Sequence, residues 1–353
     1  MVGVVASVPL DHAQFRGGPG PPAPATSRRT WIWRGILVAT GGLLLYGLLP
    51  QMVDLWSQVP RLRSIGWYAL GGVAVLQLAS WWCSAELDRV ALPMSRFVAI
   101  TASLASNAIS RVVPGAGGAL GVGVSYRMWT DGGADAGSAA SAMAATTVMS
   151  LATLFALPVV TLVFALVGAP TPPSLALVAL GGAVAFAMMF ALGAALLFND
   201  RFLGLTARLA ASVARRFHRS VTASNVTNER NRLRVVLGAR WPRALAMSIG
   251  IWLFDYLSLV AVLVALRASP RPSAVLLAFT GAKILAMIPI TPGGIGIVEV
   301  GLTGMLSLAG VPAAEALLTT LAYRLVSYWL SLPAGLIAWW LYRRRYPHAR
   351  EVT

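Results

Sequence analysis

Long apolar blocks alternate with short polar or charged connections from residue 31 onward. The blocks comprise residues 31–50, 65–85, 97–112, 118–130, 136–168, 174–198, 244–266, 273–289, 295–309 and 316–342. A transmembrane α-helix needs about 20 apolar residues to cross a hydrocarbon core of about 30 Å, and most of these blocks reach that length. The pattern therefore predicts an all-α polytopic membrane protein.

Two pairs of neighbouring blocks, within residues 97–130 and 273–309, are shorter than a bilayer crossing. The helices of the first pair would extend only about 20–24 Å. Each pair is joined by a Pro/Gly-rich turn, P-G-A-G-G at residues 114–118 and P-I-T-P-G-G at residues 289–294. Broken backbone at membrane depth persists only where it is buried in protein or lines a cavity. We expect two re-entrant hairpins with turns near the midplane; two short crossings per pair are the alternative.

The composition agrees with a membrane protein, with 57% hydrophobic residues, 11% charged residues and a mean hydropathy of +0.72. Soluble domains carry about 25% charged residues, so a soluble, disordered or secreted disulfide-rich chain is excluded. The only cysteine, Cys83, allows no internal disulfide. The histidines at 12, 218 and 348 lie outside every apolar block. We therefore expect no metal site within the membrane and no cofactor.

The positive charge is concentrated in three segments. The net charge is +16, and residues 1–34, 199–243 and 342–353 supply +14 of it. Basic residues in short loops beside membrane helices mark the cytoplasmic side, so both termini and the central loop are predicted to be cytoplasmic, in the plasma membrane. Nucleic-acid binding is the rival explanation of a basic chain, but these arginines flank helix ends. No nucleic-acid partner is expected.

The same charge pattern predicts the domain organisation. Residues 1–30, with the run G-G-P-G-P-P, are expected to form a disordered cytoplasmic tail, and residues 346–353 a second short one. Residues 31–345 form one transmembrane domain. Tracing the crossings from a cytoplasmic start gives residues 65–168 and 244–342 the same order of helix, hairpin and helix in opposite orientations, joined by the basic loop 199–243, with extra helices outside the two repeats.

Such inverted repeats occur in transporters that alternate access around a midplane site. Residue identities support the repeat only weakly. Gly133 matches Gly310 at a shift of 177 residues, and Gly117 and Gly118 match Gly293 and Gly294 at a shift of 176.

Three stretches of the second half resemble a known family. They are I-P-I-T-P-G-G-I-G-I-V-E-V-G-L at 288–302, A-G-V-P-A-A-E-A-L at 309–317 and A-Y-R-L-V-S-Y-W at 322–329. They look like the transmembrane region of the lysylphosphatidylglycerol synthase family of flippase-like proteins, over roughly residues 31–345. The resemblance implies a polytopic plasma-membrane fold and movement of a lipid-linked headgroup between leaflets.

Two differences from that family limit what the resemblance implies. The bifunctional members carry a soluble C-terminal aminoacyl-transferase domain, whereas only about a dozen residues follow the last apolar block here, so we expect that activity to be absent. A Glu-Arg pair usual in the long fourth element reads Thr146–Thr147 in this chain.

Four charged residues fall inside apolar blocks of the second half: Asp255, Lys283, Glu299 and Arg324. Each charge at the bilayer centre costs about 2.5–3.5 kcal/mol, so these residues must pair or face water. Lys283 and Glu299 lie at similar distances from the turn of the second hairpin, which predicts an ion pair between its two arms. This pair either locks the hairpin or takes part in substrate binding.

The turn Pro292–Gly293–Gly294 precedes a helix start, where free backbone N–H groups and the helix dipole favour an anion such as a lipid phosphate. Glycine packing between helices explains the glycines equally well. Arg324 can hold phosphate with two parallel hydrogen bonds, or instead bind a helix carbonyl or Asp255. In the first half, Asn107 and Arg111 precede the other turn, and Arg111 is the expected counterpart of Arg324.

Residues 201–219 place Phe202, Leu205, Leu209, Val213 and Phe217 at helical spacing with arginines at the flanks. This predicts a basic amphipathic helix bound to anionic inner-leaflet lipid, with a solvated loop helix as the alternative.

The leading functional hypothesis is a translocase of a phospholipid or lipid-linked anionic intermediate. No G-x-x-x-x-G-K-[ST] motif occurs in the chain. A membrane-embedded lipid-phosphate transferase is a second hypothesis, with Glu86 and Asp88, or Asp131 and Asp135, as its acidic residues. A non-catalytic partner in cell-envelope assembly is a third. The sequence leaves the oligomeric state open.

Overall fold

The computed structural model describes residues 66–113, 117–166, 240–268, 270–287 and 291–346, with five further positions between 180 and 188. Several predicted segments lie outside these residues, namely the tails 1–30 and 347–353, the helix at 31–50, the amphipathic helix at 201–219 and nearly all of the basic loop 199–243. The expectations for them stay predictions.

The described part of the chain is built of helices and contains no strand. The helices are α2 (Trp67–Ala91), α3 (Arg96–Val112), α4 (Gly117–Asp131), α5 (Ala136–Leu166), α9 (Trp241–Ala265), α10 (Pro272–Ala286), α11 (Ile297–Leu308), α12 (Ala313–Arg324) and α13 (Ser331–Arg345). A 3₁₀ turn at Pro292–Gly294 precedes α11, and a π-helical turn at Leu325–Trp329 joins α12 to α13. The all-α prediction is confirmed, and the helices coincide with the apolar blocks to within a few residues.

Three described helical segments are long and apolar enough to cross a membrane: Ala136–Thr161, Trp241–Ala265 and Ala313–Arg345. The last comprises α12, the π-helical turn and α13 as one continuous rod. Two shorter apolar helices, α10 and α11, fall below the length of a crossing. They correspond to the second short pair recognised in the sequence.

Similar local signals end the two short helices α4 and α11. Gly133 and Gly310 follow these helices with φ of +98° and +95°, a backbone conformation that glycine adopts without steric strain. In each turn two backbone N–H groups donate to carbonyl groups of the preceding helix, Gly133 to Thr130 and Gly310 to Ser307 at 3.0 Å, each followed by a second such bond. The next helices begin at Ala136 and Ala313, which are also 177 residues apart.

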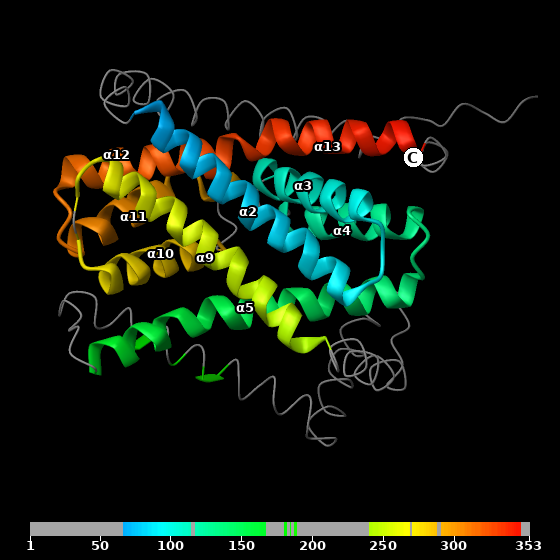
Figure 1. Ribbon diagram of the computed structural model, residues 1–353, viewed down its shortest axis with the longest axis horizontal. Helices are drawn as coiled ribbons and strands as arrows, with labels where there is room; N and C mark the ends of the chain where they lie inside the picture. The colour runs from blue at the N-terminus through cyan, green and yellow to red at the C-terminus, as the bar shows by residue number, and fades with distance from the viewer. Residues whose placement is uncertain are drawn as a thin grey trace, which may run out of the picture. The chain divides into compact units, whose positions relative to one another are not determined.

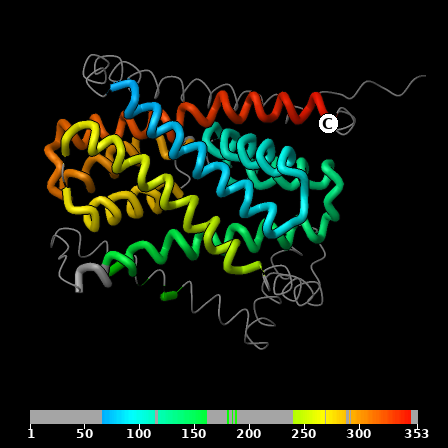
Figure 2. The backbone as a smooth tube through the Cα atoms, viewed as in Figure 1, coloured from blue at the N-terminus to red at the C-terminus, as the bar shows by residue number. Residues whose placement is uncertain are grey.

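Helices α2 and α9, each 25 residues long, pack against each other along much of their length at the centre of the described region (Figure 1). Gly250 on α9 permits their close approach, because a Cβ there would lie 2.7 Å from Sγ of Cys83 on α2. The two hairpins pack reciprocally, α3 against α13 and α10 against α5. Figure 2 shows α13 alongside α3 and α4.

Buried apolar side chains form two main clusters. The larger joins α9, α10, α11 and α12 with the start of α2, and includes Phe279, Leu302 and Leu306. The other joins the end of α2 with α3, α4, α5 and α13, and includes Trp129 and Tyr342.

Candidate functional site

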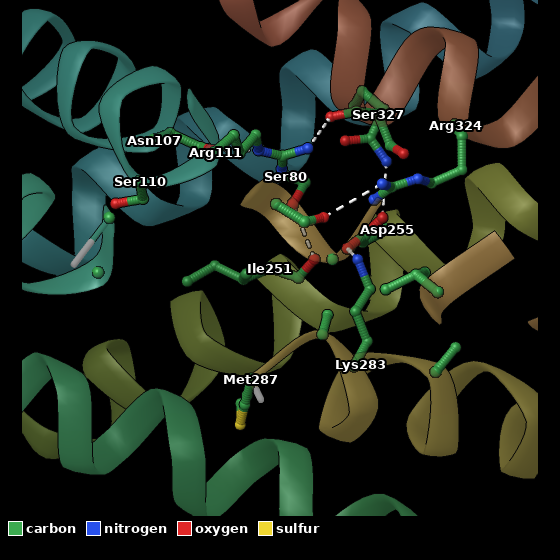
Figure 3. A pocket seen from close by; sticks show the side chains of 18 of the residues that line it. Ser80, Asn107, Ser110, Arg111, Ile251, Asp255, Lys283, Met287, Arg324 and Ser327 are labelled. Atoms are coloured by element: carbon green, nitrogen blue, oxygen red, sulfur yellow. Dashed lines mark hydrogen bonds and ion pairs between the residues drawn. The ribbon is translucent and has the colours of Figure 1, made fainter. Parts of the chain in front are cut away.

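A cavity of about 580 Å³ is lined by side chains of α2, α3, α9, α10 and α12 and by the turn before α11. We call it the charged cavity, because Arg111, Asp255, Lys283 and Arg324 line it (Figure 3). Its volume falls within the range of small-ligand sites, about 300–1,000 Å³. Segments distant in sequence thus bring together most of the charges predicted to lie in the membrane.

Asp255 is the centre of one polar network in this cavity. Its carboxylate forms an ion pair with Lys283 at 2.5 Å and accepts hydrogen bonds from Gln77 at 2.7 Å and from the Tyr323 hydroxyl at 2.6 Å. Lys283 also lies over the rings of Phe279 and Tyr323, 5.2 and 5.5 Å from their centroids. The network joins α2, α9, α10 and α12, and its two charges neutralise each other.

Glu299 is the centre of a second network. Arg324 Nε donates to it at 2.8 Å, and the backbone N–H of Gly296 donates to its other carboxylate oxygen at 2.7 Å, which caps the start of α11. The Lys283–Glu299 pair predicted from the sequence is therefore wrong. Lys283 and Glu299 lie at similar distances from the turn of one hairpin, but their partners lie on other helices. Lys283 faces Asp255 on α9, and Glu299 faces Arg324 on α12.

The glycine turn differs from the open anion site expected at residues 292–294. Gly293, Gly294 and Gly296 all have positive φ, but the N–H of Gly294 donates to the Thr291 carbonyl at 3.1 Å and that of Gly296 is used by Glu299. The Gly293 carbonyl instead accepts a hydrogen bond from Arg324 at 3.1 Å. A Cβ at Gly293 would collide with the Tyr328 ring, so the turn serves to seat Arg324 beside Tyr328.

Arg111 enters the cavity from the last turn of α3. Its Nε donates to Asn107 Oδ1 and its Nη1 to the Ser327 carbonyl, both at 2.6 Å. Ser327 lies in the π-helical turn, where hydrogen bonds shift from i+4 to i+5 and leave carbonyl groups available to outside donors. Arg111 forms no ion pair with any described carboxylate.

The two arginines share one aromatic ring. The guanidinium carbon of Arg324 lies 4.6 Å from the Tyr328 ring centroid and that of Arg111 lies 5.7 Å from it. The negative face of an aromatic ring attracts cations. The predicted correspondence between Arg111 and Arg324 thus has a spatial counterpart, since both guanidinium groups line one cavity (Figure 3).

Counting the charges gives the electrostatic character of the site. Arg111, Lys283 and Arg324 are three cations, whereas Asp255 and Glu299 are two carboxylates, and both carboxylates are already paired. Among the residues that the structure describes, the site therefore holds one excess positive charge at Arg111. The buried Thr291 hydroxyl, which also lines the cavity, has no hydrogen-bond partner among the described residues.

Comparison with known proteins shows where this chain belongs. The model of the family described as the lysylphosphatidylglycerol synthase TM region matches residues 32–335. The chain belongs to this family. It is an integral membrane protein, which agrees with the three described helical segments that are long and apolar enough to cross a membrane.

Two curated relatives carry the name UPF0104 membrane protein, and both come from Methanothermobacter thermautotrophicus. One is 29% identical over 92 residues and the other is 32% identical over 91 residues. Each match covers 26% of this chain, and the chain spans only 26% and 27% of the lengths of these relatives. No solved structure matches the chain.

Several residues of the site were not predicted from the sequence. Gln77, Tyr323, Ser327 and Tyr328 hold the charged groups in place. Asp255 was predicted to be an intramembrane charge and a possible partner of Arg324, but its ion pair is with Lys283. Gln77 could have been predicted as a site residue, because it is an uncharged polar residue within the apolar block 65–85. The hydrogen bond from Arg111 to a backbone carbonyl could not be predicted from the sequence, because every residue type carries that carbonyl.

The acidic residues near the end of α2 were candidates for transferase chemistry. Glu86 is 3% exposed and receives two hydrogen bonds from Arg89, at 2.7 and 2.8 Å. Arg96 and Arg243 lie 3.7 and 3.6 Å from it. Glu86 therefore ties α2 to the first turns of α3 and α9. In the described ranges no group of three or more His, Cys, Asp or Glu residues could hold a metal ion.

Proposed function

We propose that this protein is a translocase of a phospholipid or lipid-linked anionic intermediate, whose phosphate occupies the charged cavity. The observation that carries the proposal is the excess positive charge at Arg111, a partly buried guanidinium without a carboxylate partner in the described part of the chain. A phosphodiester carries a single negative charge at neutral pH, which equals that excess. Binding it would complete the charge balance of the cavity.

The geometry suits a phosphate in two further respects. Arg111 and Arg324 approach the Tyr328 ring from different helices, so a phosphate between them would contact both repeats. Guanidinium groups remain charged in any environment and bind phosphate oxygens in pairs. The unpartnered Thr291 hydroxyl offers one more donor. Glu299 and the turn Pro292–Gly293–Gly294 position Arg324, Lys283 neutralises Asp255, and Asn107 positions Arg111.

An inverted repeat supplies the mechanism that we propose for movement between leaflets. Several features support it: α2 and α9 have equal length, Gly133 and Gly310 share one turn geometry, and each short helix pair packs on the last helix of the opposite half. We propose that the pairs α3–α4 and α10–α11 are re-entrant hairpins entering from opposite sides. Rocking of one half against the other would then expose the cavity to each leaflet in turn.

The orientation in the membrane is part of the same proposal. We place both termini and the basic loop in the cytoplasm of a plasma-membrane protein, with residues 201–219 bound to anionic inner-leaflet lipid. The end of α13 fits a cytoplasmic membrane interface, because Arg343 and Arg344 lie over Trp339 and Trp340, at 4.3 and 3.7 Å from their ring centroids. Tryptophan and basic residues are enriched at that level of a bilayer.

The proposal is tested with purified protein in vesicles containing a fluorescent anionic phospholipid. The parent protein should speed exchange of the lipid between leaflets. Arg111→Gln should slow it roughly 10- to 100-fold, the expected effect of removing a charge-assisted hydrogen bond, without unfolding the protein because no carboxylate loses its partner.

Arg343→Gln is the matched control, since it removes one positive charge outside the cavity and should change the rate less than about twofold. Exchange of the anionic lipid by Arg111→Gln at the parent rate would rule out the phosphate site. Absence of exchange by the parent protein would rule out the translocase.

A further inference from the structure

A second cavity, of about 390 Å³, adjoins the charged cavity. It lies among α2, α3, α4, α5 and α9, and eight serine and threonine residues line it, so we call it the hydroxyl cavity. Its described lining includes one carboxylate, Asp88, and no basic residue. At about 30 Å³ per water molecule, its volume equals about a dozen waters, which is room for one sugar ring or a polyol of similar size.

Many polar groups of this cavity are free to bind a ligand. The hydroxyl groups of Ser106, Ser110, Thr147 and Ser150 make no hydrogen bond with other protein groups in the described part of the chain. The Trp129 indole N–H is fully buried and also lacks a partner there. A buried unpaired donor costs about 1–3 kcal/mol, and an acceptor supplied by a ligand in the cavity would satisfy the Trp129 N–H.

The two cavities share part of their lining. Ser84, Asn107, Ser110 and Trp252 border both. Asn107 uses its amide oxygen to hold Arg111, which directs its two amide N–H donors elsewhere. A group attached to a phosphate at Arg111 would therefore reach the hydroxyl cavity across Asn107 and Ser110.

We propose that the hydroxyl cavity binds an uncharged sugar or polyol attached to the lipid phosphate, so that the substrate is a glycosyl or polyol phospholipid rather than a bare lipid phosphate or an amino lipid. Hydroxyl-bearing ligands both donate and accept, as do the serine and threonine side chains facing them, while Asp88 accepts and Trp129 donates. Sites built to bind hydroxyl groups strongly reject ligands that lack them. This inference rests on the proposed function for its choice of a lipid as the ligand.

The test compares phosphatidylinositol, phosphatidic acid and phosphatidylethanolamine with identical acyl chains, by thermal stabilisation of the full chain in detergent micelles. Phosphatidylinositol should stabilise the protein at about a tenfold lower concentration than the other two lipids. The double variant Ser106→Ala with Ser150→Ala should lose about tenfold in affinity for phosphatidylinositol and keep its affinity for phosphatidic acid. Thr161→Val, a buried α5 change outside both cavities, is the control and should alter neither.

Equal stabilisation of the parent by all three lipids would overturn the polyol site, as would a phosphatidylethanolamine preference. The translocase would still stand if anionic lipid exchanged between leaflets. Conversely, selective phosphatidylinositol binding that the double variant abolishes, without any leaflet exchange, would uphold the polyol site and refute the proposed transport.

Discussion

Lys283 is the only lysine among the 28 basic residues of the chain, and its ammonium group is committed to Asp255. Among the described residues, Arg111 is bound only by neutral groups. These two cations therefore have different roles although both line one cavity. Removing one partner of a buried ion pair leaves an uncompensated charge, which costs about 3–5 kcal/mol, whereas removing Arg111 leaves no carboxylate unpaired.

Lys283→Met should accordingly destabilise the protein by about 3–5 kcal/mol, because Asp255 stays buried and charged. Adding Asp255→Asn should recover most of the loss, since the amide keeps hydrogen-bonding capacity toward Gln77 and Tyr323. The thermal unfolding midpoint in detergent measures both effects. Losses that simply add in the double variant would show that the two residues are not coupled.

At the scale of elements, the short helices α4 and α11 each end in a turn whose glycine has a left-handed backbone conformation. Other glycines serve packing instead. Gly335 on α13 faces Leu104 and Ala108 of α3 so closely that a Cβ would collide with them. Gly304, within α11, has no neighbouring heavy atom within 4 Å of an added Cβ.

These environments predict opposite effects for one substitution. Gly310→Ala should lower stability by about 1 kcal/mol or more, because alanine is strained at φ +95°. Gly304→Ala should be neutral or stabilising by up to about 1 kcal/mol, because alanine favours the helix and meets no clash there. Thermal midpoints of the two variants measured side by side would decide, and an equal shift in both would argue against the strained turn.

The helices were predictable from the sequence and the partners within the site were not. The blocks around α9 and α10 were evident because apolar periodic segments and Pro/Gly turns are local features. The pairing of Lys283 with Asp255 depends on which helices pack together, and sequence spacing along one hairpin carries no such information. Arg111 and Arg324 were recognised as site candidates because a charge within an apolar block is itself informative.

At the scale of the whole molecule, the reciprocal packing of each hairpin on the opposite half suggests that neither half is complete alone. Arg111 from the first half contacts the Ser327 carbonyl and the Tyr328 ring of the second. A substrate bound between Arg111 and Arg324 would thus sense the relative position of the halves, as alternating access requires.

The proposed inverted repeat makes a prediction about sidedness. Ala136 and Ala313 are exposed first residues of α5 and α12, and the proposed repeat would place the first on the cytoplasmic side and the second outside. In a Cys83→Ser background, Ala136→Cys should react only with membrane-permeant thiol reagents in intact cells, whereas Ala313→Cys should react with impermeant reagents as well. Labelling of both cysteines by the impermeant reagent would contradict the inversion.

The π-helical turn at Leu325–Trp329 changes the phase of the long rod from Ala313 to Arg345. Each residue of an α-helix advances about 100° around the axis, so one extra residue within a turn rotates everything beyond it by about that angle. A single helical wheel drawn through the rod would place its charged and lipid-facing stripes out of register. The two ends can therefore face different surroundings, with Arg324 turned toward the cavity and Trp339 and Trp340 exposed on the surface.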